Sequence, residues 1–248
     1  MKRILLIAVL LGAMITVTTY FVCIAAPSVL FGKGIKGSGN LITRTIEAPD
    51  FDRVEAARAV KVVITDKATD KITIEADDNI LDYVVVEAKG GCLTATIDKK
   101  INNVSNTNVT ITIPANGHIR ALDASSASKI SGDVVLSADK FSIDASSAAK
   151  INVSVKAASC SIEASSAAKI TLKGSAAKCS IEMSSASKLS AADFVVTDCS
   201  VETSSAAKAS INCTGQLNAE ASSGSSISYS GDCQASINKS SGGSVRRN

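Results

Sequence analysis

The sequence is poor in aromatic residues, histidine and proline, and it carries almost no excess charge. Its 248 residues include no Trp, one His and three Pro, and aromatics make up 3%. One His excludes a His-rich zinc centre within one chain, and it equally excludes an iron site of two His and a carboxylate. The net charge is +3, of which Lys2 and Arg3 supply two. The remaining charge of about +1 gives no electrostatic reason to expect a nucleic-acid partner.

The N-terminus has the pattern of an export signal. A basic start, Met1-Lys2-Arg3, precedes the uncharged run Ile4–Ala26, which is the order found in a secretory signal peptide. The run is also long enough for an uncleaved membrane anchor. We therefore expect a signal peptide or signal anchor at residues 1–26 and a location in the periplasm, at the cell surface or outside the cell. Membrane contact is expected only through this segment, if it stays uncleaved.

The second half of the chain is a repeat. A Ser-Ser pair recurs every 18 to 21 residues, and five of the seven copies continue with Ala, then Ala or Ser, then Lys. Around each pair apolar and polar residues alternate, as in Cys160-Ser161-Ile162-Glu163-Ala164. Alternation with a period of two is typical of strands with one buried face. The pairs begin at Ser125, Ser146, Ser165, Ser184, Ser204, Ser222 and Ser240.

This pattern predicts an all-β fold: a single-stranded parallel β-helix of about seven rungs of ~19 residues. Each rung is expected to hold two strands and two bends, with equivalent side chains stacked about 4.8 Å apart. A right-handed coil is favoured because parallel crossovers are nearly always right-handed, although this repeat length also suits a left-handed coil. We divide the chain into the signal segment (1–26), a linker (27–41), an N-terminal β region or cap (42–120) and the β-helix repeats (121–248).

Residues 42–120 lack the Ser-Ser repeat but contain strand-like runs. Turn residues at Asp66–Asp70 and Lys89–Gly91 predict hairpins. We expect this region to close the N-terminal end of the coil, because an uncovered end exposes strand edges and invites aggregation. The predicted strands are Ile42–Ala48, Arg58–Thr65, Lys71–Ala76, Tyr83–Ala88, Leu93–Asp98 and Val109–Pro114.

Two columns of like charge are the candidate binding surfaces. Neighbouring lysines in one column repel by about 1 kcal/mol in water, and carboxylates across the bend are expected to offset this. The lysine column could meet an anionic polysaccharide and the acidic column could bind cations weakly, and the alternative for both is a solvated face that keeps the rod soluble. The lysine column is Lys129, Lys150, Lys169, Lys188 and Lys208, and the acidic column is Asp123, Asp144, Glu163, Glu182, Glu202 and Glu220.

Paired carboxylates can cleave glycosides or bind Ca²⁺. The acidic column is uniform, however, whereas an active site normally interrupts a repeat. Ser-x-x-Lys, the nucleophile motif of penicillin-binding enzymes, occurs five times, as at Ser126/Lys129. The motif lies here among strands and bends rather than on a helix. Its five copies recur at the repeat spacing, which indicates that it belongs to the structural repeat and is not one active site. We predict no catalytic residue, no cofactor and no metal site.

The cysteines and the histidine have structural interpretations. Cys160, Cys179 and Cys199 share one inward column with Phe141 and Leu217, which indicates a ladder of small apolar thiols. Neighbouring rungs bring such cysteines within disulfide range, and an exported chain permits the bond. Cys213 and Cys233 are a second candidate pair, and the pairing stays open. His118 lies in a turn, and no Gly-x-Ser-x-Gly motif accompanies it.

Several segments, taken in order along the chain, resemble a known family. The chain is similar to the autotransporter adhesin, head GIN domain family of exported bacterial proteins, common in Bacteroidetes, over about residues 36–245. One departure is Ser-Ser at the bends, where the family usually has Ser-Gly. The resemblance implies a β-helix-like fold outside the cytoplasm and an adhesin role, and it supplies no binding residues. The matching segments are Gly37–Asn40, Asn79–Leu81, Val109–Pro114, Ile227–Asp232 and Ser241–Val245.

These observations predict an exported, non-catalytic surface or periplasmic module with adhesin-like binding. A rigid rod with flat polar ladders suits an extended extracellular glycan or a host protein. One alternative is a polysaccharide-processing β-helix enzyme, which would show a pocket that breaks the columns. Another is an envelope structural or stress protein without a specific ligand.

Overall fold

The computed structural model describes residues 34–248 except 68 and 102. Gly32–Asn248 form a compact unit of their own. The predicted signal segment lies outside the described residues. Of the residues described, only Leu81–Tyr83 (η2) form a regular helix, a single 3₁₀ turn. Over these same residues no helix is long and apolar enough to cross a membrane.

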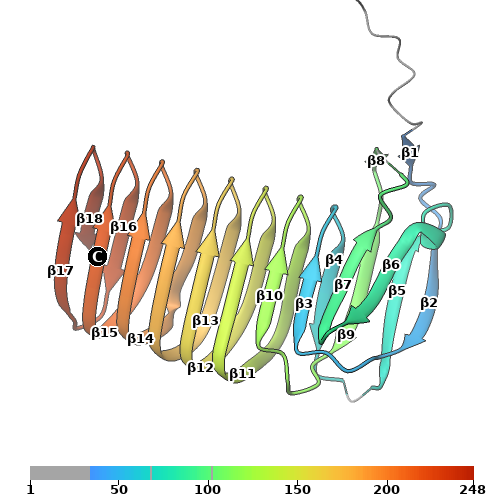
Figure 1. The fold of residues 1–248 in the computed structure, drawn as a ribbon, viewed down its shortest axis with the longest axis horizontal. Coiled ribbons are helices and arrows are strands. Elements are labelled where there is room, and N and C mark those ends of the chain that lie inside the picture. The colour runs from blue at the N-terminus through green and yellow to red at the C-terminus, as the bar shows by residue number, and fades with distance from the viewer. Residues whose placement is uncertain (1–33, 68, 102) are drawn as a thin grey trace, which may run out of the picture. The chain divides into compact units, whose positions relative to one another are not determined.

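The repeats form a parallel β-solenoid, as predicted (Figure 1). Long strands run from one Ser-Ser turn to the next, and each pairs in register with its successor, so that Lys150 faces Lys169 and Ile162 faces Ile181. Equivalent side chains therefore stack along the rod. The strands are β10 (Ala121–Ala124), β11 (Lys129–Ala145), β12 (Lys150–Ala164), β13 (Lys169–Met183), β14 (Lys188–Thr203), β15 (Lys208–Ala221), β16 (Ser226–Ser230), β17 (Gln234–Lys239) and β18 (Ser244–Arg247).

The alternating pattern places the core between the two sides of each turn. In β12 alternate residues are buried on each side of the curve at Ala157–Ser159, among them Ile151, Cys160 and Ile162, each at most 2% exposed. Burying one such aliphatic side chain stabilises the fold by roughly 1.5–3 kcal/mol. The predicted column of small residues is also buried, with Ala145 at 0% and Ala164 at 4% exposure. Small side chains at this position keep the interior narrow beside the tight turn.

Each Ser-Ser pair opens a two-residue reverse turn. In the first one Ser126 and Ala127 have φ of 51° and 60°, and Ser128 N–H donates to Ser125 O at 3.0 Å, which defines a type I′ turn. Left-handed conformations cost non-glycine residues about 1 kcal/mol each. Contacts between rungs offset this cost, because Ala127 N–H donates to Ser147 O of the next turn at 2.9 Å. The turns form the ridge along the top of Figure 1.

In β11 to β15 the opposite end of the rung differs from the prediction of two separate strands and a second bend, whereas β16 and β17 of the last turn are separate strands. At that end of β13, for example, the chain curves within one continuous strand. The ladder between β13 and β14 shifts register between Thr171 and Gly174. Gly174 has φ of 108°, and a Cβ on it would lie 2.1 Å from Val155 O. Curvature is therefore taken up by local irregularities that glycine permits.

The solenoid begins earlier in the chain than the Ser-Ser repeat indicates. Strands β3 (Arg53–Ala56) and β4 (Lys61–Thr65) pair in register with β10 and β11. Arg58 and Ala59 between them have φ of 60° and 61°, so the same turn occurs here without serine. The predicted strand Arg58–Thr65 was wrong at its start, because its first residues form this turn.

Antiparallel strands close the N-terminal end. Strands β7 (Cys92–Ile97) and β9 (Val109–Pro114) lie parallel to β3 and β4. β6 (Val84–Lys89), β5 (Lys71–Asp77) and β2 (Leu41–Glu47) follow in antiparallel pairing, and short strands β1 (Ile35–Lys36) and β8 (Val104–Ser105) pair with each other. The hairpin at Lys89–Gly91 is confirmed. The hairpin at Asp66–Asp70 is wrong, because β9 lies between β4 and β5.

At this end of the molecule, hydrogen bonds join two segments that carry the family resemblance, Gly37–Asn40 and the loop that follows β5. The buried Asp77 carboxylate accepts hydrogen bonds from Gly39 N–H at 2.8 Å and Asn108 N–H at 2.7 Å. Ser38 Oγ donates to Asp78 Oδ1 at 2.6 Å, and this bond, with one from Asn40, lowers the pKa of Asp78. Gly37–Asn40 and the loop after β5 therefore have a structural role.

Candidate binding surface

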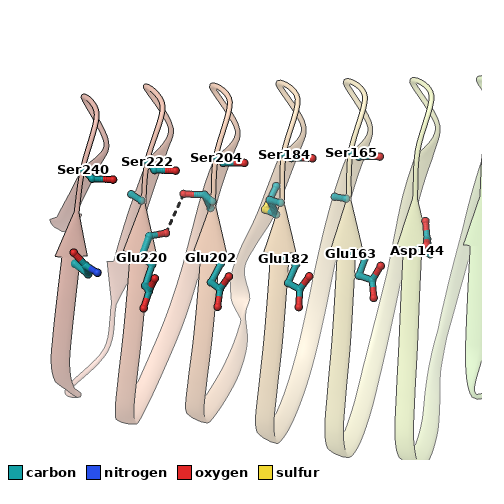
Figure 2. A pocket seen from close by; sticks show the side chains of 15 residues that line it. Asp144, Glu163, Ser165, Glu182, Ser184, Glu202, Ser204, Glu220, Ser222 and Ser240 are labelled. Carbon is teal, nitrogen blue, oxygen red and sulfur yellow. Dashed lines mark hydrogen bonds between the residues drawn. The ribbon is translucent and has the colours of Figure 1, made fainter.

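The acidic column forms a straight ladder on one face of the solenoid. Its members occupy the second position before each turn and are Cα partners on successive rungs, as with Glu163 and Glu182. Their neighbours along the strand point inward, so alternation turns every carboxylate outward. Figure 2 shows Asp144 and the glutamates stacked one per rung along this face. We name Asp123, Asp144, Glu163, Glu182, Glu202 and Glu220 the acid ladder.

The ladder is one residue longer than the sequence pattern indicated. Glu55 of β3 pairs with Asp123 and is exposed. The serine signal does not mark this rung, but Val54-Glu55-Ala56 repeats the apolar, acidic and small positions found before later turns, as in Leu122-Asp123-Ala124 and Ile162-Glu163-Ala164. Matching those columns alone would have found it.

The two ends of the acid ladder differ in charge compensation. Arg53 Nε lies 2.5 Å from Asp123 Oδ2, and the hydrogen bond to Asp123 raises the pKa of Arg53. Further along, burial and the neighbouring Asp123 raise the pKa of Asp144. No salt bridge is found for Glu163, Glu182, Glu202 or Glu220 over the described part of the chain. Their charge is compensated by solvent and mobile ions, so it is available to a ligand.

A shallow groove of about 360 Å³ runs beside the carboxylates. One wall is the acid ladder and the other is formed by the first serine of each turn (Figure 2). Ser165, Ser184 and Ser204 present a hydroxyl beside each carboxylate. Anionic acceptors and hydroxyls therefore recur together, one set per rung, over several turns. Such a groove is open along the rod and suits an extended ligand rather than a compact one.

A second hollow, of about 770 Å³, lies lower on the same face. Side chains of mixed polarity line it, among them Lys178, Asp198 and Gln216. Lys178 and Asp198 are Cα partners on adjacent rungs. In contrast to the groove, this hollow carries both signs of charge and no column of like charge.

The lysine column lies on the strands that leave the turns, on the other side of each rung from the acid ladder. Lys129 pairs with Lys150 and with Lys61 of β4, so this ladder too gains one member. Across residues 34–248, masked positions aside, no ion pair joins the two ladders. The expected offset of lysine repulsion by carboxylates across the bend is therefore not found. We name Lys61, Lys129, Lys150, Lys169, Lys188 and Lys208 the lysine ladder.

The Ser-x-x-Lys copies have turn geometry. Ser126 occupies the exposed left-handed corner, and Lys129 begins the following strand. The spacing therefore arises from a reverse turn, whereas the nucleophile motif depends on a helical turn to bring Ser and Lys together. His118 is exposed in a bend, where its N–H donates to Asn116 Oδ1 at 3.0 Å.

The predicted thiol column is confirmed. Cys160, Cys179 and Cys199 are Cα partners on successive rungs, with Phe141 before them and Leu217 after them. The three cysteines are at most 4% exposed. The adjacent Cys160 and Cys199 thiols, together with burial, raise the pKa of Cys179, so it stays a neutral, apolar core thiol.

A parallel β-solenoid with outward ladders of like side chains places the chain in the class of β-solenoid repeat proteins. The family model for putative auto-transporter adhesin, head GIN domain, matches residues 50–233. The chain belongs to this family, which confirms the resemblance seen in the sequence. A search of curated proteins gives no match.

Solved structures with the same fold include several bacterial proteins. A putative adhesin from Bacteroides fragilis NCTC 9343 is 19% identical with a TM-score of 0.77, over 87% of this chain and 100% of that one. One from Parabacteroides merdae ATCC 43184 is 17% identical with a TM-score of 0.69, over 88% and 100%. A putative lipid binding protein from Parabacteroides distasonis ATCC 8503 is 18% identical with a TM-score of 0.71, over 87% and 100%. At these identities the likeness establishes the fold.

Proposed function

We propose that this protein is an exported, non-catalytic adhesin-like module of the cell surface or periplasm, which holds an extended glycan or protein along the acid ladder. The observation that carries this proposal is the uninterrupted register of the carboxylates beside the serine-lined groove. Membership of a family described as auto-transporter adhesins supports both the binding role and the export.

The chemistry of the groove favours a partner with positive charges. Unpaired carboxylates at about 4.8 Å spacing create a negative potential along a line. A partner with cationic groups along its length gains from several rungs at once, and its affinity falls as salt rises. The polar lining does not suit an acyl chain, because carboxylates and hydroxyls would be buried without hydrogen-bond partners.

The uniform ladder supports a binding role over catalysis. A glycoside hydrolase gives its two carboxyl groups different surroundings, so that one holds a proton while the other is ionised. Glu163, Glu182 and Glu202 each lie between two acidic partners on the adjacent rungs, which gives no such division of roles. A polysaccharide-processing enzyme is therefore the second candidate function. The binding experiment described next also tests for it, because hydrolysis of an arrayed glycan can be measured.

The test is binding of the 32–248 fragment to glycan arrays and host-matrix proteins. The fragment is used because these residues form a compact unit of their own. We expect salt-sensitive binding that the triple substitution E163Q/E182Q/E202Q weakens by at least ~10-fold. The matched control K150Q/K169Q/K188Q removes as many charges from the other ladder and is expected to keep binding.

Other outcomes would change the assignment. Loss of binding in the lysine variant alone would move the site to the lysine ladder. Hydrolysis of an arrayed glycan, abolished by the acid variant, would favour the enzyme. Absence of binding to every glycan and matrix protein would contradict the adhesin-like role.

A further inference from the structure

The last turn of the solenoid has no outer neighbour among the residues that the structure describes. Every residue of β17 is exposed, although β17 repeats the inward and outward alternation of the earlier strands. Its inward Ile237 is 42% exposed, whereas the equivalent Ile181 is 2% exposed. This turn contributes the least burial, and local opening of the solenoid is expected to begin here.

We propose that Cys213 and Cys233 form a disulfide that fastens this last turn to the turn before it. Cys213 belongs to β15, and Cys233 lies between β16 and β17. The bond is independent of the ligand proposed above. It is expected to persist in the oxidising compartment that export implies.

The register places the two cysteines at one corner of adjacent rungs. Asn212 is the partner of Ser230 and Gln216 is the partner of Gln234. Three residues lie between these pairs on each rung, so Cys213 falls opposite Gly231, and Cys233 falls opposite Gly215. The cysteines are thus diagonal neighbours on the inner side of the curve, where inward side chains converge.

Glycines leave the space that the bond needs. Gly231 is opposite Cys213, and a Cβ there would lie 2.1 Å from Cys213 O. Gly215 is opposite Cys233 and adds no side chain between the two rungs. The rungs therefore approach closely at this corner.

The Cys213 side chain is already turned toward this corner. Its Sγ lies 3.3 Å from Gln216 O and 3.2 Å from Thr197 O. Gln216 pairs with Gln234, the residue next to Cys233. Cys213 is buried and Cys233 is half-buried against the core. Burial raises the pKa of the Cys213 thiol to about 11, with smaller contributions from Cys199 and Cys233.

The thiol column is a poorer place for a disulfide. Cys160, Cys179 and Cys199 are at most 4% exposed in the core, whereas Cys233 is half-buried and solvent reaches it. An oxidant in solution therefore reaches Cys233 in the folded chain and does not reach the thiol column.

The chemistry is ordinary thiol–disulfide exchange with an oxidant that is itself a disulfide. The Cys233 thiolate attacks the oxidant and releases one thiol, which leaves a mixed disulfide on Cys233. The Cys213 thiolate then displaces the second thiol and closes the bond. The two cysteines lose two protons and two electrons in total, and the oxidant is reduced to two thiols.

The test starts from the fully reduced 32–248 fragment, treated with oxidised glutathione. Free thiols are then alkylated under denaturing conditions, and peptides are mapped by mass spectrometry without reduction. We expect a peptide pair joined through Cys213 and Cys233 and lighter by two hydrogens. Hydrogen exchange of β17 and β18 amides is expected to slow by about tenfold or more on oxidation.

Two variants serve as matched controls. Cys233→Ser should abolish both the linked peptide and the slowed exchange, and Cys92→Ser, which changes the other half-buried cysteine, should preserve both. Three results would overturn the proposal: alkylation of both Cys213 and Cys233 after oxidation, a link from either to a different cysteine, or a link with unchanged exchange in β17.

Discussion

The repeat region and the N-terminal region use the same β-sheet pairing but depend on their residues in different ways. In the repeats each turn contacts mainly its neighbours, as in other solenoids. The column in which a residue lies therefore matters more than the residue type. Met183 and Thr203, for example, lie in the same column as Ala145 and Ala164. The buried Thr203 hydroxyl is accommodated because Ser225 on the next turn lies 2.8 Å from it.

Beyond β3 and β4 the N-terminal region does not continue the charged columns, because Glu55 pairs with Thr94 and Lys61 pairs with Thr110. Its strands change from parallel to antiparallel, and single polar side chains bring together segments far apart in sequence. Asp77, for example, binds both Gly39 and Asn108. A change in the repeats is therefore expected to act locally, whereas a change at such a junction should loosen the whole closure. Substitutions in each region test this difference.

The largest effect is expected from Asp77→Ala. Asp77 is fully buried, and its loss leaves two N–H groups, of Gly39 and Asn108, without their acceptor. A hydrogen bond to a charged carboxylate contributes about 1.5–3 kcal/mol, so the loss of both should lower the free energy of unfolding by about 3 kcal/mol or more. Urea denaturation of the 32–248 fragment measures this.

Asp78→Ala is the control for that substitution. Asp78 is exposed and binds the side chains of Ser38 and Asn40 at the surface. Its removal should change the unfolding midpoint little, because water can replace the carboxylate. Equal losses for the two variants would contradict the role given to the buried carboxylate.

An intermediate effect is expected from Gly174→Ala in the repeats. The φ of 108° disfavours any side chain, and the added Cβ would lie 2.1 Å from Val155 O. We expect a loss of about 2–3 kcal/mol, with increased hydrogen exchange limited to β12, β13 and their neighbours. Loss of protection throughout the N-terminal strands would show that defects in the solenoid do not stay local.

Gly224→Ala is the matched control for Gly174. Gly224 has φ of 71°, and a Cβ there would meet nothing within 4 Å. Equivalent turns already carry alanine at this position, as at Ala127 and Ala206. The substitution should cost about 1 kcal/mol or less, so the two glycines separate the effect of a close contact from that of a left-handed turn.

Sequence reasoning succeeded where the fold repeats a local pattern. Identical side chains at a fixed period must stack, so the columns at Ile143, Ile162 and Ile181 predicted both the parallel register and the inward face. The same logic placed the acid ladder and the thiol column. The same logic missed the first turn, because this turn has no Ser-Ser pair and has Arg58 and Ala59 in the equivalent positions.

Pairing between distant segments left no local signal. The residues at Asp66–Asp70 are those of a turn, and nothing in them reveals that β9 separates β4 from β5. The hydrogen bonds that Gly39 and Asn108 donate to Asp77 were likewise not predicted. Two adjacent aspartates are typical of a solvated loop, so the sequence gives no sign that one of them is buried. The groove between the carboxylates and the serines was not predicted either, because its shape depends on the path of the backbone through each turn.

The smallest effect is expected from Asp144→Asn, and it bears directly on the contrast with Asp77. Burial and the neighbouring Asp123 raise the pKa of Asp144, so the ionised form is less favourable in the folded chain than in the unfolded one. This penalty is fully present above the folded pKa and disappears below the ordinary value of about 3.9. Asp144→Asn should therefore raise the melting temperature slightly at pH 7 and leave it unchanged near pH 3. A lower melting temperature at pH 7 would mean that the ladder stabilises the fold, as Asp77 does, whereas we infer that the repeats carry this row of charge at a cost in stability.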